Sequence, residues 1–129
     1  MTRLGSEEAR EVAEHFYRVS KALGDYRFAH WDTLGKTERL SIEAMEWSLL
    51  NASSDFTAVA VDVSLDDAAP VVKSVAHATR AMKAAIKRAE RVDRVLSIAT
   101  AAVKLTGAIL SGSPSAIAAA LDRALKSAS

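Results

Sequence analysis

The sequence predicts an all-α fold, an elongated bundle of four principal helices. Apolar or small residues recur at alternating steps of three and four along most of the chain, which is the spacing of one face of a helix. The two prolines and five glycines, which favour helix ends, are few. A chain of 129 residues has the size of one domain. We therefore expect a single helical domain, 1–129, with helices at about 6–24, 37–65, 67–110 and 114–126.

The first predicted helix covers residues 6–24. Ser6 is the expected N-cap, and the two glutamates that follow it suit the positive end of the helix dipole. Gly24 is the expected C-terminal stop. Residues 25–36 lose the helical spacing but keep large apolar side chains, so we expect a packed aromatic connector. These side chains are Tyr26, Phe28, Trp31 and Leu34.

The second predicted helix, 37–65, is apolar on two faces. The first seam, of three-four spacing, contains Ile42, Met45, Leu49, Ala52, Phe56, Val59 and Val63. A second seam, nearly opposite, contains Leu40, Ala44, Trp47, Asn51, Ser54, Ala58, Val61 and Leu65. A helix with two such faces is expected to lie between partners. The β-branched residues at 57–63 also suit a strand, but we favour a helix because no second strand is evident to pair with it.

The third predicted helix, 67–110, is the longest. Asp66 or Asp67 can cap it, and Pro70 then falls in the first turn, where its missing N–H costs little. One face carries a continuous seam of apolar or small residues, namely Val71, Val75, Ala78, Met82, Ala85, Ala89, Val92, Leu96, Ala99, Val103, Thr106 and Leu110. About 40 helical residues would reach roughly 60 Å, which would make the molecule elongated.

Residues 111–114 form the clearest boundary in the sequence. Gly112 suits the left-handed conformation that follows many helices. Ser113 and Pro114 suit the N-cap and the first position of a fourth helix at 114–126. We therefore expect a hairpin that folds the alanine-rich fourth helix back over the third.

Charge is divided unevenly along the chain. Residues 1–67 carry seven Lys or Arg and thirteen Asp or Glu, a net charge of −6, whereas residues 68–129 carry ten and three, a net charge of +7. The third predicted helix contains a basic stripe, a candidate electrostatic surface formed by Lys73, Arg80, Lys83, Lys87, Arg91 and Arg94. A stripe of this kind is usually solvated or paired with acidic groups.

After Arg94 the same side of the third predicted helix becomes apolar and needs a cover. The fourth helix, a second subunit or lipid could supply that cover, and we favour the fourth helix. Because the fourth helix has few large side chains, we also expect a homodimer through the remaining apolar surface. The candidate partner surface, called the apolar stripe below, consists of Val95, Ile98, Leu105, Ile109, Ile117 and Leu121.

No pattern in the sequence indicates catalysis, a cofactor or a metal. The chain has no cysteine, and its glycines are too scattered to form a phosphate-binding loop. Glu11 precedes His15 by one helical turn, but we expect Glu11, Glu14 and His15 to form a solvated charged face. A di-iron bundle would need Glu three residues before His, and no histidine here has one. An enzyme is therefore not expected.

These patterns favour a non-enzymatic protein–protein interaction module in the cytoplasm, such as a small adaptor, a regulatory partner or a toxin-neutralising partner. The alternative is a peripheral membrane protein that uses the apolar hairpin 95–121, whose only charge before Leu121 is Lys104. Nucleic-acid binding by the basic stripe is less favoured because no aromatic residue for base stacking lies near it. The sequence does not specify which protein would be bound.

Overall fold

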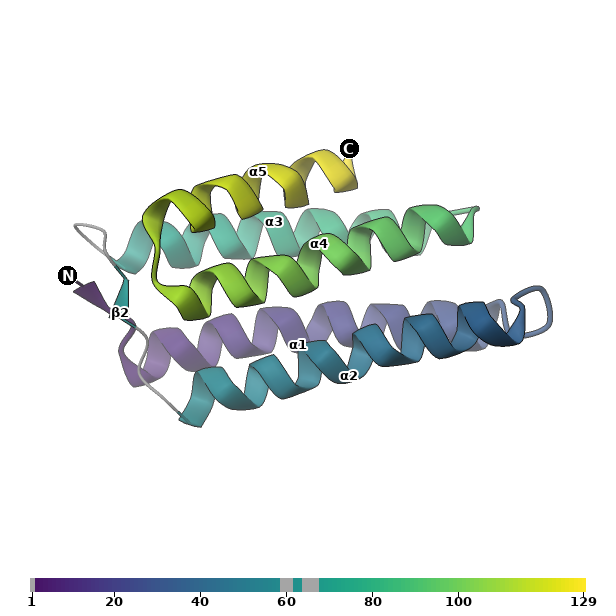
Figure 1. Cartoon of the computed structure of the whole chain (residues 1–129), viewed down its shortest axis with the longest axis horizontal. Helices are drawn as coiled ribbons and strands as arrows, with labels where there is room; N and C mark the ends of the chain where they lie inside the picture. The colour runs from purple at the N-terminus through teal and green to yellow at the C-terminus, as the bar shows by residue number, and fades with distance from the viewer. Residues whose placement is uncertain (1, 59–61, 64–67) are drawn as a thin grey trace.

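The computed structural model describes residues 2–58, 62–63 and 68–129, with side chains for 4–58 and 69–129. It is all-helical apart from one short β pairing. Figure 1 shows α1 and α2 in one layer, α3 and α4 in the next, and α5 lying over α3 and α4. The five helices are α1 (Ser6–Ala29), α2 (Lys36–Ala58), α3 (Ala68–Arg88), α4 (Val92–Ser111) and α5 (Pro114–Ala128).

Helix α1 continues five residues beyond the predicted stop at Gly24. Its N-cap is Gly5, whose backbone N–H donates to Glu8 Oε1 at 3.0 Å. Gly24 lies inside the helix at a close approach to α2, because a Cβ there would lie 2.9 Å from Glu46 Oε1. The glycine therefore leaves room for the Glu46 side chain instead of ending its own helix.

The packed aromatic connector at 25–36 is not confirmed. Tyr26 and Phe28 belong to α1, and only residues 30–35 connect α1 to α2. Leu34 is buried in this connection, whereas Trp31 is exposed and the Phe28 side chain is 69% exposed. The apolar composition of the segment thus reflects exposed side chains as well as buried ones.

Helix α2 ends at Ala58, seven residues before the predicted end. Residues 59–61 and 64–65 lie outside the described residues, but 62–63 form β2 (Asp62–Val63). This strand pairs antiparallel with β1 (Thr2–Arg3), with Thr2 opposite Val63. Rejecting a strand was therefore wrong for these two residues, since the N-terminal segment supplies the missing edge.

The single long helix predicted at 67–110 is wrong, because the chain turns back after Arg88 and begins α4 at Val92. In one continuous helix, the buried face of α3 (Val75, Met82) and the buried face of α4 (Ile98, Leu105) would point in nearly opposite directions. Folding back directs both faces into one core. No proline or glycine marks this turn.

The turn between α4 and α5 matches the prediction. Gly112 has φ of 71°, in the left-handed region, and follows the last residue of α4. Ser113 is the N-cap of α5, with its side chain accepting from the N–H of Ala116, and Pro114 is the first helical residue. Helix α5 therefore folds back onto α4, and it also packs on α3. At the start of α3, Pro70 occupies the first turn, as predicted.

One hydrophobic core runs along the bundle. Phe16 and Phe56 stack within it, with ring centroids 5.8 Å apart. Helix α1 packs on α2 and α3, while α2 also packs on α4. The largest fully buried side chains are Leu4, Phe16, Leu23, Ile42, Leu49, Phe56, Met82, Ile86, Ile98, Leu105, Ile109 and Ile117.

Candidate interaction surface

The second apolar seam of α2 lies on the outside of the bundle. The first seam is buried at Ile42, Leu49 and Phe56, as expected for a core face. On the opposite face the Leu40 side chain is 55% exposed and the Trp47 side chain is 59% exposed. Helices α1 and α4, on which α2 packs, therefore leave this face of α2 exposed within the described part of the chain. We call this face the outer seam; its described members are Leu40, Ala44, Trp47, Asn51, Ser54 and Ala58.

Two hydrogen bonds fix how α1 lies beside the outer seam. Ser20 Oγ donates to the carbonyl oxygen of Glu46 at 3.1 Å, and Ser53 Oγ donates to that of Ala13 at 3.0 Å. Tyr17 lies one helical turn from both Ala13 and Ser20, so this antiparallel register places it level with Leu49 and next to Leu50. Tyr17 is half exposed and Leu50 is half buried, so the apolar surface extends from α2 onto α1.

The end of the α1–α2 hairpin also presents aromatic rings. Phe28 and Trp31 stack with ring centroids 6.1 Å apart. The Arg39 guanidinium lies over the Trp31 ring, 4.7 Å from its centroid, and Arg39 Nη1 donates to the carbonyl oxygens of Trp31 and Leu34 at 3.0 and 2.6 Å. These contacts hold the exposed rings in fixed positions, which lowers the entropy lost when they are buried by a partner.

An ion pair joins α1 to α2 beside these rings. Arg27 Nε donates to Glu46 Oε2 at 2.7 Å, and its Nη2 donates to Glu46 Oε1 at 3.2 Å. Both side chains are largely buried. The hydrogen bond to Glu46 raises the pKa of Arg27 above its ordinary value, so the guanidinium stays charged. Arg27 also lies over the Phe28 ring, 4.8 Å from the centroid.

Together, the exposed large side chains of this region form what we call the hairpin surface: Tyr17, Phe28, Trp31, Leu40 and Trp47. Among the described side chains of the rest of the chain, the exposed large hydrophobics are Leu110 and Leu125. Aromatic residues held near arginines are typical of the residues that dominate binding energy at protein interfaces. The three-four spacing of the outer seam was visible in the sequence, but its exposure was not.

The apolar stripe predicted as a partner surface lies mainly in the core. Val95, Ile98, Leu105 and Ile109 of α4 are fully buried, and Ile117 of α5 is 2% exposed. Leu121 is half buried. Contact between this stripe and a second subunit would require the helices of this chain to separate.

Helix α4 is long and apolar enough, by length and composition, to cross a membrane. It is the one helix with these properties within the part of the chain that the structure describes. A helix at the centre of a bundle has the same composition, and Val95, Ile98, Leu105 and Ile109 of α4 are buried against other helices.

The structure divides the basic stripe between two helices and a turn. Lys73, Arg80, Lys83 and Lys87 lie on α3, Arg91 is the N-cap of α4, and Arg94 lies in its first turn. All are exposed except Lys83, which is half buried. Arg91 pairs with Asp93 at 2.9 Å, and Arg94 Nη2 donates to the carbonyl oxygen of Ser129 at 2.5 Å. No ion pair found among the described residues joins this stripe to acidic α2.

Beside α1, the stripe borders a shallow cavity of about 230 Å³. Lys83 and Lys87 line it together with Arg18, Lys21 and Asp25. Arg18 is already paired with Glu14 at 2.7 Å. The cavity is therefore a solvated, mixed-charge region of the surface.

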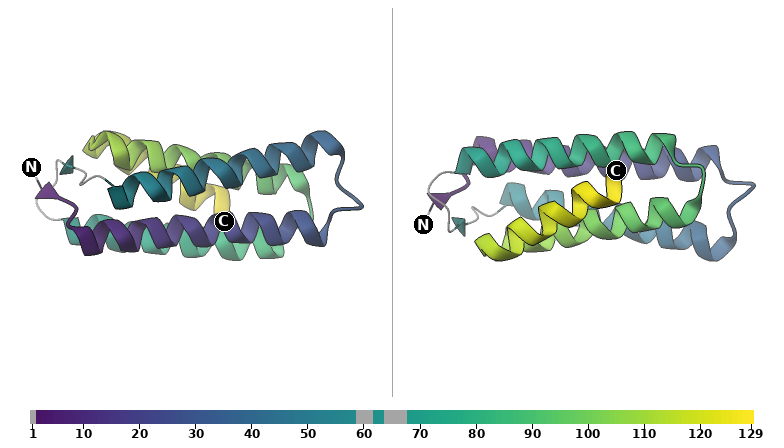
Figure 2. Two further views of the ribbon diagram at one scale, coloured as in Figure 1. Left: turned by 90° about the horizontal axis from the view of Figure 1, so that it is seen from below. Right: turned by 90° about the horizontal axis from the view of Figure 1, so that it is seen from above.

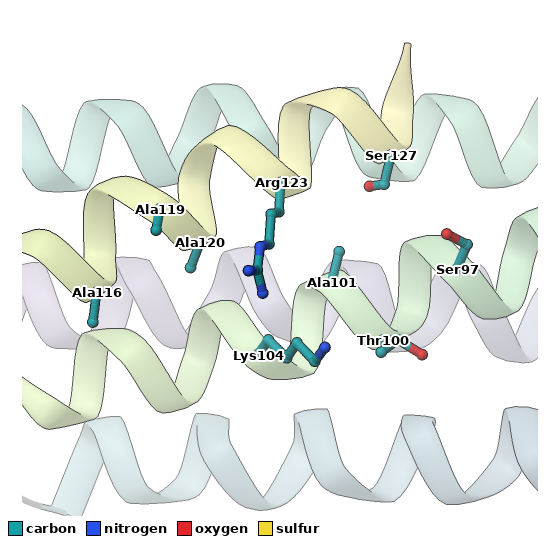
Figure 3. Close-up of a pocket in the computed structure, with 9 residues that line it drawn as sticks. All are labelled: Ser97, Thr100, Ala101, Lys104, Ala116, Ala119, Ala120, Arg123 and Ser127. Atoms are coloured by element: carbon teal, nitrogen blue, oxygen red, sulfur yellow. The ribbon is translucent and has the colours of Figure 1, made fainter.

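A groove of about 450 Å³ lies between α4 and α5. Figure 3 shows an alanine-lined floor with the Arg123 side chain extending from α5 toward α4 and Lys104 beside it. Ser97, Thr100 and Ser127 lie at one end. Lys104 and Arg123 are both exposed, so the groove offers cations to solvent and encloses no buried polar group.

The histidine predicted to lie on a solvated face is buried. His15 is 7% exposed, whereas Glu11 and Glu14 remain exposed. His15 Nε2 lies 3.6 Å from Glu11 Oε1, which is too long for a hydrogen bond, and it has no hydrogen-bond partner among the described residues. No group of three or more His, Asp or Glu side chains suited to a metal occurs within 4–58 and 69–129.

Comparison of the chain with protein-family models, with curated proteins and with solved structures finds no match.

Proposed function

We propose that this protein is a non-enzymatic helical interaction module that binds another protein through the hairpin surface. The observation that carries this proposal is the exposure of Trp47 and Leu40 on one face of α2. A protein of this size has enough core to bury such residues, and large exposed apolar patches commonly mark binding sites. An adaptor, a regulatory protein or a toxin-neutralising protein would each use a surface of this kind.

The charged residues around the hairpin surface indicate which charges a partner would carry. Glu43 lies beside the outer seam with its side chain 47% exposed, and Asp55 is also exposed on α2. Arg27 and Arg39 are already engaged with Glu46 and with the Trp31 ring. A partner with an apolar ridge flanked by basic side chains would complement this arrangement.

The membrane-binding alternative would use the hairpin 95–121, but Val95, Ile98, Leu105 and Ile109 of its α4 part are buried in the core. Nucleic-acid binding would use the basic stripe, where none of the exposed aromatic residues lies. The hairpin surface favours a protein partner over both alternatives, because its aromatic residues match the composition of protein interfaces.

Site-specific photo-crosslinking of the full chain in its native cells tests the proposal. A photoreactive phenylalanine analogue replaces Trp47 in one variant and Leu110, on α4, in a matched control. Both positions are partly exposed, but only position 47 belongs to the hairpin surface. We expect position 47 to capture a second protein that position 110 does not capture. Equal capture at both positions, or capture of nothing except another copy of this chain, would contradict the proposed function.

A further inference from the structure

We propose that the outer seam of α2 also pairs with the same seam of a second copy, antiparallel, about a twofold axis near Leu50. This inference goes beyond the proposed function, because it assigns part of the hairpin surface a second occupant, another copy of this chain. It differs from the homodimer predicted from the sequence, which used the apolar stripe now found in the core.

The spacing of the outer seam suits helix pairing. Steps of four and three from Leu40 through Ala44, Trp47 and Asn51 to Ala58 follow the repeat of a coiled coil. The seam from Leu40 to Ala58 spans about 27 Å of helix. All of its described members are exposed, so a second helix can lie along it without displacing side chains of this chain.

Antiparallel pairing matches large residues with small ones. It places Leu40 opposite Ala58 of the partner subunit and Trp47 opposite Asn51 of the partner subunit. Ala44 then meets Ser54 of the partner subunit in the layer between them. Parallel pairing would instead put two Trp47 side chains in one layer and two Ala44 side chains in the next. Steric crowding beside a gap disfavours that arrangement.

The residues that flank the seam are also compatible with antiparallel pairing. Glu43 would lie opposite Thr57 of the partner subunit, and Asp55 opposite Ser41 of the partner subunit, so no like charges meet across these positions. Leu50 would meet Leu50 of the partner subunit close to the axis. This flank is the side of α2 that faces α1, where Tyr17 lies within one residue of the level of Leu50 and adds apolar surface.

The bundle leaves room for this arrangement. In the left view of Figure 2, α1 and α2 lie in front of the other helices, and α5 lies on the far side of the bundle. A single pair of helices about 27 Å long gives a contact at the small end of the range for specific interfaces. We therefore expect a dimer that dissociates in the micromolar range.

The absence of cysteine from the sequence makes crosslinking a direct test. Single variants Leu50→Cys and Leu40→Cys are treated at high micromolar concentration with a short bis-maleimide. Antiparallel pairing brings the two introduced thiols together at position 50, but separates them by about 27 Å along the axis at position 40. An equimolar mixture of Leu40→Cys and Ala58→Cys should form a crosslinked heterodimer. Sedimentation of the untreated parent chain measures its association independently.

Crosslinking of Leu50→Cys and of the mixture, without crosslinking of Leu40→Cys alone, supports the proposal. Trp47→Ser should then weaken dimerisation about tenfold or more, while Leu110→Ser should leave it unchanged. A parent chain that sediments as a monomer, or crosslinking of Leu40→Cys alone, would overturn the antiparallel dimer. Neither result affects the capture of a different protein at position 47, so the proposed function is tested separately.

Discussion

Replacing Leu105 by alanine tests the turn between α3 and α4. Leu105 is fully buried in the core, and truncation of such a residue costs about 2–5 kcal/mol through lost burial and the cavity left behind. For 129 residues the entropy of unfolding is about 0.27 kcal/mol per kelvin. A central loss of about 3 kcal/mol therefore lowers the melting temperature by about 11 °C. Thermal unfolding followed by circular dichroism measures this change.

Leu110→Ala is the matched control for Leu105→Ala. Leu110 is 37% exposed near the end of α4, so its truncation should cost less than about 1 kcal/mol. A continuous helix over 67–110 would bury Leu110 in its seam and leave Leu105 to be covered by the fourth helix, so Leu110→Ala would then be at least as destabilising as Leu105→Ala. A larger loss of stability in Leu110→Ala than in Leu105→Ala would therefore refute the packing described for α4.

Two further substitutions test local contacts by thermal or denaturant unfolding. Glu46→Ala leaves Arg27 buried without its main partner and should lower the free energy of unfolding by about 2–3 kcal/mol. This loss is smaller than for a fully buried pair, because Glu43 lies 3.9 Å from Arg27. If adding Arg27→Ala to Glu46→Ala recovers none of the lost stability, the charge pair is not its cause. Gly112→Val forces a β-branched residue into a left-handed conformation and should cost about 1 kcal/mol or more, and a melting temperature equal to that of the parent would contradict this assignment.

Local signals in the sequence predict the backbone conformation correctly where one residue type strongly favours one conformation. Gly112 is left-handed, Ser113 caps α5 and Pro114 begins it, all as the residue types predict. Glycine elsewhere was ambiguous. Gly24 was interpreted as a stop, but it serves close helix packing against Glu46, and that neighbour comes from a different part of the chain.

The turn after Arg88 had a signal of a different kind. In the third predicted helix, the side that carries the basic stripe becomes apolar after Arg94, and we predict that the fourth helix covers it. The three residues between α3 and α4 contain no proline or glycine. The chain breaks into two helices here because the buried faces of α3 and α4 must both point into one core. Local residue preferences do not express this tertiary requirement.

The candidate site was missed for a related reason. The two seams of α2 have similar spacing, so periodicity alone assigns both to buried positions. Which seam is buried depends on where α1 and α4 pack, and both of them lie on the side of Leu49 and Phe56. Likewise, the apolar stripe needs a cover, as predicted, and the bundle supplies it through α2 and α3 as well as α5, the predicted fourth helix.

The fold-back after Arg88 and the exposure of the outer seam have a common origin. A straight helix over 67–110 would present its apolar faces on two sides, and the predicted surface for a partner was one of them. Folding back directs Met82 of α3 and Ile98 of α4 into the same core, while α5 packs on both helices from the side opposite α1 and α2. The apolar surface of the C-terminal half is thereby largely buried. Trp47 and Leu40 then remain as large apolar side chains that the described helices leave exposed, so the proposed binding surface lies on α2.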